Sequence, residues 1–451
     1  MSPLNFKEGT IWVRDNLHII RGMNSNCIDL IYLDPPFKSD VKYRGLPTDF
    51  GGDGVVKAEF NDMWKLRDTD VTWHNSLEKD NRCIYEVIEA SEFSFGKDMK
   101  SYLIYMTARL FEMHRVLKET GSIYLHCDYH AGHYLKTILD CVFGHGNFRN
   151  EIVWQRDIPG KGAKKGSKQF PRTHDTILFY SKGKEYLFNQ ITAELSEKQK
   201  KAYRYTEKSG RKYKAVQLGD YSEKSISEME EKGLIHVSST GKKYKKYYLD
   251  EAEATVGNIW TDILGFGTKT AAGERTGYPT QKPLELMHRI IKASSGEGDI
   301  VLDPLCGCAT ALVAAEQLNR RWVGIDISPV ARFLVRNRMR KETNLFDTYD
   351  PISRTDPPVR TDVGKRAKET RQEMRQRLYV EQDALCNGCF WNIPLHIMND
   401  DHITPKSGGG PDVPENIQLL CGTCNSIKGG RDMAYLHTRL KELGYMNPEH
   451  E

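Results

Sequence analysis

The sequence predicts an α/β fold in which a largely parallel β-sheet is covered by helices on both faces. Three observations lead to this prediction. Apolar strand-like runs alternate with amphipathic helices over residues 11–150 and again from residue 283. The periodicity weakens over residues 155–257, which indicates an insert. Two Cys-x2-Cys pairs near the C-terminus add a small separate unit, and 451 residues are too many for one ordinary domain.

The first half of the chain supplies a strand, a helix and a second strand in turn. Residues 27–33 form a short apolar run that stops at Asp34 and two prolines. Residues 100–118 carry apolar side chains at helical spacing, and Gly121 is the expected stop. Residues 122–127 then predict the next strand. Because parallel strands buried on both faces read as continuous apolar runs, this order indicates a sheet covered on both sides.

Regular alternation returns after the insert. A helix is expected over residues 283–293, a strand over 299–302, a helix over 310–318 and a strand over 322–325. The following stretch has several prolines, few apolar residues and dense mixed charge, which is typical of a linker or an exposed helix. The expected units are therefore residues 1–154, 155–257, 258–344, 345–378 and 379–451.

Composition places the chain among soluble globular proteins. Its hydrophobic share is 39% and its charged share 28%. No apolar run approaches the roughly 18–20 residues that a bilayer span requires. Residues 1–10 hold neither a basic cluster nor an apolar core segment, so we expect no signal peptide and a cytoplasmic protein.

Positive charge is concentrated in the insert. The whole chain carries a formal charge of only +4, whereas residues 151–250 hold 22 Lys and Arg against 13 Asp and Glu. Nine of the 22 tyrosines lie in the same block. Basic residues interleaved with tyrosine suit phosphate neutralisation and base stacking, although a solvated lysine-rich insert is the alternative.

The tetrapeptide Asp34-Pro35-Pro36-Phe37 follows a predicted buried strand, where open α/β sheets place their active sites. The prolines remove backbone donors and stiffen the loop, which leaves the Asp34 carboxylate and the Pro35 carbonyl as fixed acceptors. Two acceptors without a donor suit an exocyclic amino group, whose lone pair they would localise as a methyl group approaches. Phe37 would stack on a base taken out of its duplex. A structural Pro-rich turn is the alternative.

A second strand–turn–helix–strand unit indicates a nucleoside ligand. Asp303 ends a strand, a small-residue turn with Gly307 follows, and the next strand ends at Asp326. In nucleotide-binding half-folds, the second acid binds the ribose hydroxyls. The turn lacks the three-glycine dinucleotide spacing, so S-adenosylmethionine, a nucleoside without phosphate, is the best candidate cofactor. An ordinary βαβ crossover is the alternative.

Together these stretches resemble the DNA amino-methyltransferases in which the catalytic tetrapeptide precedes the cofactor loop. The matching stretches are residues 15–17, 28–37, 150–154, 174–180, 280–286 and 303–331. The resemblance covers roughly residues 11–340. It implies a Rossmann-like S-adenosylmethionine-dependent methyltransferase fold with an inserted target-recognition region, and double-stranded DNA as the partner. In the cofactor loop, Leu305, Cys308 and Ala309 replace the usual Phe, Ser and Gly.

The resemblance also assigns roles to residues. Those that hold and stack the target base are Asp34, Pro35 and Phe37, with Pro36 in the same catalytic loop. Those that hold S-adenosylmethionine are Asp303, Gly307 and Asp326, with Lys282 and Pro283 beside them. An aspartate at the start of the tetrapeptide is commoner in the adenine-N6 branch than in the cytosine-N4 branch, so we expect adenine.

Four of the ten cysteines form two pairs, whereas the other six are scattered. Cys386 and Cys389 are separated by thirty-one residues from Cys421 and Cys424. In a cytosolic chain, such pairs indicate a metal more often than a disulfide, and four thiolates in two knuckles are the usual structural zinc site. A unit this small needs a bound metal or a similar cross-link to be stable. A zinc ribbon that serves only as scaffold is the alternative.

Residues 380–432 resemble the HNH nuclease family with a paired-cysteine zinc site, which implies a ββα-metal fold. The resemblance rests on the segment from Asp400 to Gly410, on residues 416–420 and on Asn425. It implies that His402 deprotonates a water that attacks a phosphodiester, that Asp401 and Asn425 hold Mg²⁺, and that Asn416 fixes the histidine loop. Asn425 stands where many relatives have histidine, and a neutral amide is a weaker ligand.

Three interpretations of the whole chain stay open. The first joins a DNA methyltransferase and a nuclease, in restriction–modification, phage defence or a mobile element. The second keeps methylation and makes the C-terminal unit a zinc-stapled DNA-docking module. The third is a DNA-binding regulator without catalysis, against which the intact acid, histidine and tetrapeptide positions count. The sequence leaves open the recognition site and the oligomeric state, a homodimer included.

Overall fold

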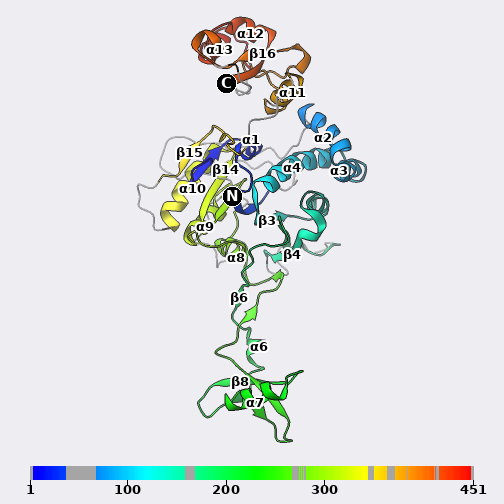
Figure 1. Cartoon of the computed structure of the whole chain (residues 1–451), viewed down its shortest axis with the longest axis vertical. Helices are drawn as coiled ribbons and strands as arrows, with labels where there is room; N and C mark the ends of the chain where they lie inside the picture. Colours follow the sequence, from blue (N-terminus) through cyan, green and yellow to red (C-terminus); the bar gives the residue numbers. More distant parts are fainter. Residues whose placement is uncertain are drawn as a thin grey trace.

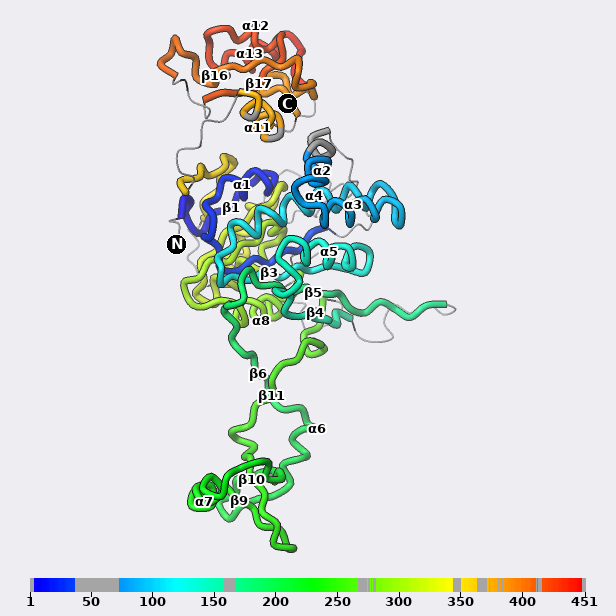
Figure 2. The backbone as a smooth tube through the Cα atoms, turned by 45° about the vertical axis from the view of Figure 1, so that its right-hand side comes forward, coloured from blue at the N-terminus to red at the C-terminus, as the bar shows by residue number. Residues whose placement is uncertain are grey.

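The computed structural model describes residues 4–36, 68–157, 168–266, 274, 276, 278, 281–343, 350–362, 371–382, 384–410, 412 and 416–447. Three parts are distinct in Figure 1 and Figure 2: a central α/β body, an arm that projects from one end of it, and a small C-terminal unit beyond the other end. In the described part of the chain, no helix combines the length and the apolar character needed to cross a membrane.

A nine-stranded mixed sheet forms the centre of the body. Its order is β12 (Ile259–Trp260), β4 (Phe148–Gln155), β5 (His174–Ser181), β3 (Leu117–Cys127), β2 (Ile28–Leu33), β13 (Ile300–Asp303), β14 (Arg321–Asp326), β1 (Thr10–Val13) and β15 (Ile352–Arg354). Strands β3 to β15 in this order are parallel to their neighbours, and β5 is antiparallel to both β3 and β4. The expected sheet is therefore present, with one reversed strand.

Helices cover both faces of the sheet, as the continuous apolar runs predict. Along β2, Ile31 and Leu33 enter one core, and Leu30 and Tyr32 enter the other. The first core also contains side chains of α1 (Asn16–Gly22), α3 (Arg82–Phe95), α4 (Lys97–Val116) and α5 (Gly132–Leu139). The second contains side chains of α8 (Leu284–Ser294), α9 (Thr310–Gln317) and α10 (Pro329–Glu342).

The order in which successive strands are added to the sheet reverses between β2 and β13, which are parallel to each other. From β2 the chain passes through α2 (Asp68–Asp80), α3 and α4 to β3 on one side, and from β13 it passes through α9 to β14 on the other. Leu302 pairs with Ile31, so the carboxyl ends of β2 and β13 lie side by side. In open α/β sheets, ligands bind at such a switch point.

The arm is narrower than the range expected for the insert. Residues 174–181, inside that range, form β5 of the main sheet, whereas the part beyond the ribbon of β6 (Thr192–Ala193) and β11 (Ala254–Thr255) projects (Figure 2). Its tip is a four-stranded sheet with α6 (Glu197–Lys200) and α7 (Glu223–Glu231) beside it. The strand order at the tip is β7 (Tyr205–Thr206), β8 (Lys212–Gln217), β10 (Lys243–Tyr248) and β9 (Ile235–Val237).

The C-terminal unit has a small core of its own. Strands β16 (Met398–His402) and β17 (Ile417–Cys421) pair antiparallel and pack with α11 (Arg371–Glu381), α12 (Gly422–Lys428) and α13 (Met433–Glu442). Two short 3₁₀ turns, Leu395–Ile397 and Lys406–Gly408, complete it.

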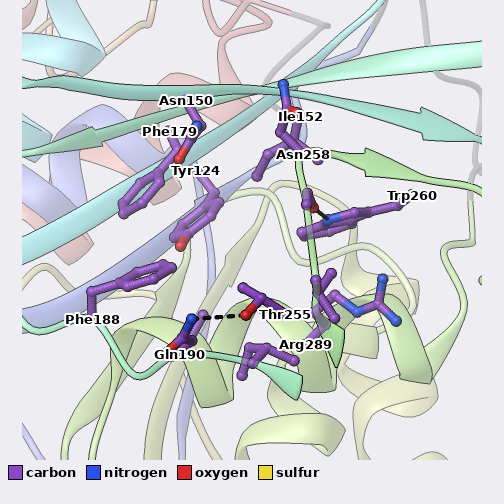
Figure 3. A pocket seen from close by; sticks show the side chains of 14 residues that line it. Tyr124, Asn150, Ile152, Phe179, Phe188, Gln190, Thr255, Asn258, Trp260 and Arg289 are labelled. Carbon is purple, nitrogen blue, oxygen red and sulfur yellow. Dashed lines mark hydrogen bonds between the residues drawn. The ribbon is translucent and has the colours of Figure 1, made fainter. Parts of the chain in front are cut away.

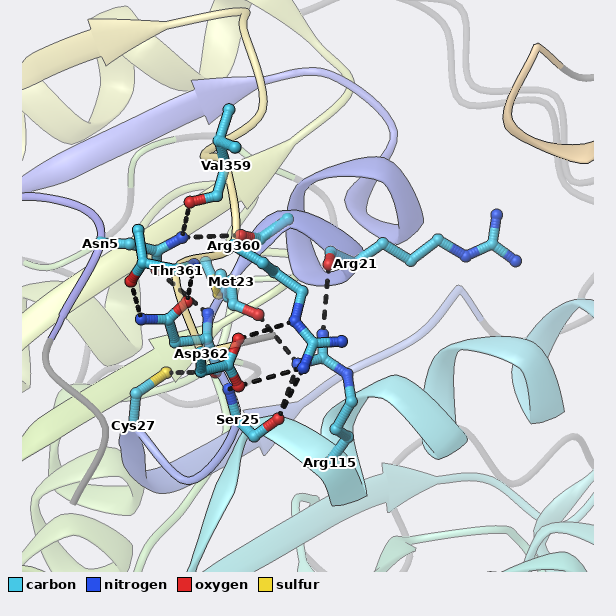
Figure 4. A network of polar contacts seen from close by, with 12 residues as sticks. Asn5, Arg21, Met23, Ser25, Cys27, Arg115, Val359, Arg360, Thr361 and Asp362 are labelled. Atoms are coloured by element: carbon cyan, nitrogen blue, oxygen red, sulfur yellow. Dashed lines mark hydrogen bonds and ion pairs between the residues drawn. The ribbon is translucent and has the colours of Figure 1, made fainter. Parts of the chain in front are cut away.

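The expected linker, residues 345–378, contains a segment that is fixed to the body. β15 extends the main sheet, and residues 359–362 bind the N-terminal segment (Figure 4). Asn5 donates to the Val359 carbonyl at 2.7 Å, and the Ser25 amide donates to the Asp362 carboxylate at 2.7 Å. Only part of the expected linker therefore remains as a connection.

One disulfide was not expected from the scattered cysteines. Cys83 of α3 is bonded to Cys141 in the π-helical turn Asp140–Gly144 that follows α5. Local sequence gives no signal for it, because the two cysteines are brought together only by the packing of α3 against α5.

Candidate functional site

The predicted catalytic loop lies at the switch point between β2 and β13. Asp34 follows the last residue of β2, and the Lys282 ammonium lies 2.5 Å from Asp34 Oδ2. Lys282, expected beside the cofactor, thus contacts the carboxylate expected to hold the target base. Pro35 is buried and Pro36 half-buried, whereas Phe37 lies outside the described residues.

The turn after β13 is arranged by Asp303 and Asp326. Asp303 accepts a hydrogen bond from the Leu305 amide at 3.2 Å. Asp326, at the end of β14, accepts from the amides of Gly307 and Ser328, both at 2.8 Å. Gly307 has a φ of +46°, and a Cβ there would lie 3.0 Å from the Tyr278 ring, so glycine suits both the turn and its close contact.

Burial alters the pKa of both Asp303 and Asp326. Burial raises the pKa of Asp303 well above its usual value, and the nearby carboxylates of Asp34 and Asp326 add to the effect. Burial likewise raises the pKa of Asp326. A cationic ligand would relieve this cost, and a carboxylate that accepts two amides still has lone pairs for hydroxyl donors. The residues present therefore fit S-adenosylmethionine, which has a sulfonium, an ammonium and ribose hydroxyls.

A buried arginine that the sequence analysis missed supports this turn. Arg109 of α4 donates through Nε to Asn16 Oδ1 at 2.6 Å and forms an ion pair with Asp15 at 2.7 Å. Asn16 in turn donates to the Pro304 carbonyl at 2.9 Å. The sequence did contain a signal for its burial, because Arg109 is a charged residue within the apolar stripe of the predicted helix, next to Leu110.

One cavity among the described residues is separate from the catalytic edge. It has a volume of about 560 Å³ and lies at the root of the arm (Figure 3). Its walls include the stacked rings of Tyr124 and Phe179, 4.4 Å apart, together with Phe188 and Trp260. None of the predicted site residues lines it.

The tip of the arm has one face that carries several lysines close to tyrosine rings. Lys214 pairs with Tyr247 across β8 and β10, and Lys245 pairs with Val216. The Lys214 ammonium is 5.0 Å from the Tyr203 ring, and that of Lys245 is 5.1 Å from the Tyr247 ring. Tyr247 and Val216 are exposed. This face, called the Lys–Tyr face below, offers positive charge together with aromatic surface.

The four paired cysteines converge in the C-terminal unit. The sulfur atoms of Cys386, Cys389, Cys421 and Cys424 all lie within 4.8 Å of one another. The Cys421 amide donates to Cys386 Sγ at 3.1 Å. Four thiols in this arrangement suit a closed tetrahedral zinc site, and they join β17 and α12 to the loop before β16.

The predicted nuclease residues Asp401 and His402 lie on β16, Asn416 lies just before β17, and Asn425 lies on α12. His402 Nε2 is 2.8 Å from Asp412 Oδ1. The Asn416 side chain accepts from the Thr404 amide at 2.9 Å and donates to the Thr404 carbonyl at 3.0 Å, so it braces the loop two residues after His402.

Asp401, the expected metal ligand, is held by a buried lysine that the sequence analysis missed. Lys428 is 0% exposed, and its ammonium lies 3.0 Å from Asp401 Oδ2 and 2.7 Å from the His402 carbonyl oxygen. Gln418 donates to the same carboxylate at 2.8 Å. Asn425 lies one helical turn before Lys428 on α12, so both face β16. The Asp401 carboxylate and the Asn425 amide are both suitable ligands for a divalent ion, but the Lys428 ammonium offsets the negative charge of Asp401.

The family comparisons agree with this division of the chain. The DNA methylase family model matches residues 28–332, and the HNH endonuclease model matches residues 386–431. The type II methyltransferase M.EcaI of Enterobacter cloacae is 31% identical over 264 residues, which cover 53% of this chain and 57% of that enzyme. The DNA adenine methyltransferase YhdJ of Escherichia coli is 26% identical over 322 residues, covering 71% of this chain and 78% of YhdJ. The solved PvuII DNA methyltransferase (cytosine-N4-specific) has a TM-score of 0.38 and 12% identity, covering 77% of this chain and 93% of that one.

Proposed function

Because the chain belongs to the DNA methylase family and carries an HNH endonuclease domain, we propose that it methylates an exocyclic base amine of double-stranded DNA and also cleaves DNA. The observation that carries the first half is the pairing of β2 with β13, which puts Asp34 and Asp303 at adjacent strand ends. A base-binding carboxylate and a cofactor-binding carboxylate must be neighbours for direct methyl transfer.

S-adenosylmethionine supplies the electrophilic methyl group. Asp34 and the Pro35 carbonyl accept hydrogen bonds from the amine, which localises its lone pair for attack. Lys282 orients Asp34 through their ion pair. Phe37 stacks on the base, and Asp303, Gly307 and Asp326 hold the cofactor, with Pro283 next to them at the start of α8.

Adenine N6 is the proposed target atom. The aspartate at the start of the tetrapeptide supports it, and so does the similarity to YhdJ, which is named as an adenine methyltransferase. Cytosine N4 is the alternative target. The Lys–Tyr face of the arm is proposed to contact DNA, because phosphate neutralisation and base stacking need these two side-chain types.

In the HNH domain, His402 is the proposed general base, and Asp412 orients its ring. Asp401 and Asn425 would hold a divalent ion such as Mg²⁺, which stabilises charge on the scissile phosphate. The four cysteines hold the structural zinc. Similarity to type II methyltransferases supports a role in restriction–modification, with phage or mobile-element DNA modification as related settings.

A second candidate function follows from the Asp401–Lys428 pair. If the ammonium keeps the divalent ion out, the C-terminal domain docks DNA without cutting it. Both candidates share the methyltransferase activity and differ only in cleavage.

The test is incubation of the full chain with plasmid, Mg²⁺ and labelled S-adenosylmethionine. Label transfer should be lost in Asp34→Asn and kept in Asp262→Asn, which removes an exposed carboxylate outside the site. Nicking should be lost in His402→Ala and kept in His396→Ala, an exposed histidine of the same domain. Label transfer by Asp34→Asn at the parent rate refutes the catalytic loop. Methylation without nicking selects the docking function.

A further inference from the structure

Behind the catalytic loop lies a buried polar array that the mechanism above does not use. The Tyr32 hydroxyl is 2.9 Å from His126 Nδ1, and His126 Nε2 is 3.3 Å from Asp175 Oδ2. These residues, called the Tyr32 relay below, come from β2, β3 and β5, three neighbouring strands. All three side chains are buried, His126 completely. Such an array is costly to bury, so it calls for a functional explanation.

The charges around the array determine its protonation. Although burial opposes it, the hydrogen bond from His126 and the positive charges of Arg156 and Lys282 hold the pKa of Asp175 below its usual value. Burial raises the pKa of Tyr32 well above its usual value, and the charge of Asp34 adds to this. Asp175 is therefore ionised and Tyr32 is a neutral phenol.

This pattern fixes the direction of each hydrogen bond. Ionised Asp175 only accepts, so His126 Nε2 carries a proton and donates it. A phenol hydroxyl donates to the unprotonated nitrogen of an imidazole, so in this tautomer Nδ1 accepts from the Tyr32 hydroxyl. The Tyr32 proton points toward His126, and its oxygen lone pairs point away from the ring.

Tyr32 lies on the catalytic side of the sheet. Side chains two residues apart on a strand share a face, so Tyr32 and Asp34 project to the same side of β2. Lys282 contacts Asp34 and also contributes to the electrostatics of Asp175, which places the relay and the catalytic loop around one region. The rings of His126 and Trp154 pack edge to face, with centroids 5.6 Å apart.

The chemistry requires a proton acceptor in this region. When a neutral amine attacks the methyl group, an N–C bond forms, the S–C bond breaks, and the nitrogen becomes cationic with one proton too many. Asp34 already accepts a hydrogen bond from Lys282 and, in the proposed mechanism, a second one from the amine.

We propose that the Tyr32 relay accepts the proton that the methylated amine loses, an inference that rests on the proposed methyl transfer. The amine proton passes to the Tyr32 oxygen while the Tyr32 hydroxyl proton passes to His126 Nδ1. The amine is left neutral and methylated, Tyr32 is again a phenol, and His126 becomes an imidazolium paired with Asp175. Arg156, which is partly exposed and borders Asp175, marks the side from which the proton later reaches solvent.

The sharpest test compares two tyrosines. Tyr124 is the register partner of Tyr32 on β3, is equally buried, and hydrogen-bonds to Ser294 at 2.7 Å instead of the relay. Tyr32→Phe and Tyr124→Phe each remove one buried hydroxyl from neighbouring strands. The assay is single-turnover methylation of a DNA duplex by the full chain as a function of pH, with cofactor affinity and thermal unfolding measured on each variant.

We expect Tyr32→Phe to lower the single-turnover rate by at least about tenfold, below the usual range of general acid–base effects because Asp34 remains as an alternative acceptor. Cofactor affinity should be unchanged, and Tyr124→Phe should methylate at the parent rate. The parent rate should fall toward acid, because the relay can accept a proton only while it is unprotonated, and this fall should vanish in Tyr32→Phe. A Tyr32→Phe enzyme with the parent rate and pH profile overturns the proposal.

A second variant distinguishes a loss of proton transfer from a loss of packing. Asp175→Asn removes the charge that stabilises the imidazolium and should slow the reaction similarly. In Tyr32→Phe/Asp175→Asn the two losses should not add, because both residues act in one transfer. Fully additive losses, or losses that follow thermal stability, assign the array a structural role only. If the parent chain transfers no label, the proposed methyl transfer itself fails, a result distinct from either of these.

Discussion

Lys428 provides the strongest stability prediction for the C-terminal domain. Its ammonium is fully buried, and the carboxylate it meets, Asp401, is 9% exposed. The ammonium also holds the His402 carbonyl, so it joins α12 to the end of β16. Lys428→Met keeps most of the side-chain volume and removes the charge, which leaves Asp401 buried with Gln418 as its remaining polar partner among the contacts described.

The size of the effect follows from burial. Removing one partner of a buried ion pair typically costs about 3–5 kcal/mol, because the other charge is left uncompensated. Lys406–Asp412, in the same domain, is the matched control, with side chains 60% and 70% exposed. An exposed pair contributes roughly 0–1 kcal/mol, so Lys406→Met should cost about 1 kcal/mol or less.

The assay is native-state hydrogen exchange of the full chain, read on the amides of β16 and β17. Lys428→Met should lower their protection free energy by about 3 kcal/mol or more, and Lys406→Met should leave it nearly unchanged. Replacing both charges, in Asp401→Asn/Lys428→Met, should recover much of the loss. Equal effects of the two single lysine variants would refute the reasoning, and so would a double variant as unstable as Lys428→Met.

Four further predictions concern the other sites. Because the pKa of Asp303 is raised, this acid must lose its proton to meet a cationic cofactor, so cofactor affinity measured by calorimetry should fall as pH decreases, and Asp303→Asn should flatten this dependence. Lys214→Gln and Lys245→Gln should each reduce the slope of log DNA affinity against log salt by about 1. A zinc chelator should unfold the C-terminal domain, seen by circular dichroism, while cofactor binding by the rest of the chain persists. Gly22→Ala should detach the segment around Pro358 and expose it to proteases, because a Cβ at Gly22 would lie 2.0 Å from the Pro358 carbonyl oxygen.

Local periodicity predicted the helices and strands of the body, and most of the predicted ends lie close to the observed ones. The helix expected over residues 310–318 is Thr310–Gln317, and the one expected over 283–293 is Leu284–Ser294. The prediction that Gly121 stops a helix was wrong. The helix ends at Val116, and Gly121 lies within β3, where a Cβ would be 2.8 Å from the Asp29 carbonyl oxygen. Glycine at position 121 reflects a close contact between strands, and a single sequence cannot distinguish such a glycine from one that ends a helix.

Contacts between distant segments explain what the sequence could not predict. β5 inserts antiparallel between β3 and β4, and its apolar run gives no sign of its partners. The buried ion pairs of Arg109 and Lys428 could not be predicted, because their partners are visible only after folding. The candidate acids and the cysteine cluster were predicted from residue type and spacing, and the role of His402 from the resemblance to the HNH family. Their supporting residues come from other elements and left no local pattern.

The fixed segment before the C-terminal domain connects the two proposed activities. Residues 359–362 are held by the N-terminal segment, where Arg360 keeps the pKa of Asp362 well below its usual value (Figure 4). Arg371 begins α11 nine residues after Asp362, a connection of at most about 32 Å when extended. Without this attachment the connection would begin at the end of β15, Arg354, and reach about 60 Å. The attachment therefore keeps the nuclease near the body, so cleavage should occur within a limited distance of the methylated base.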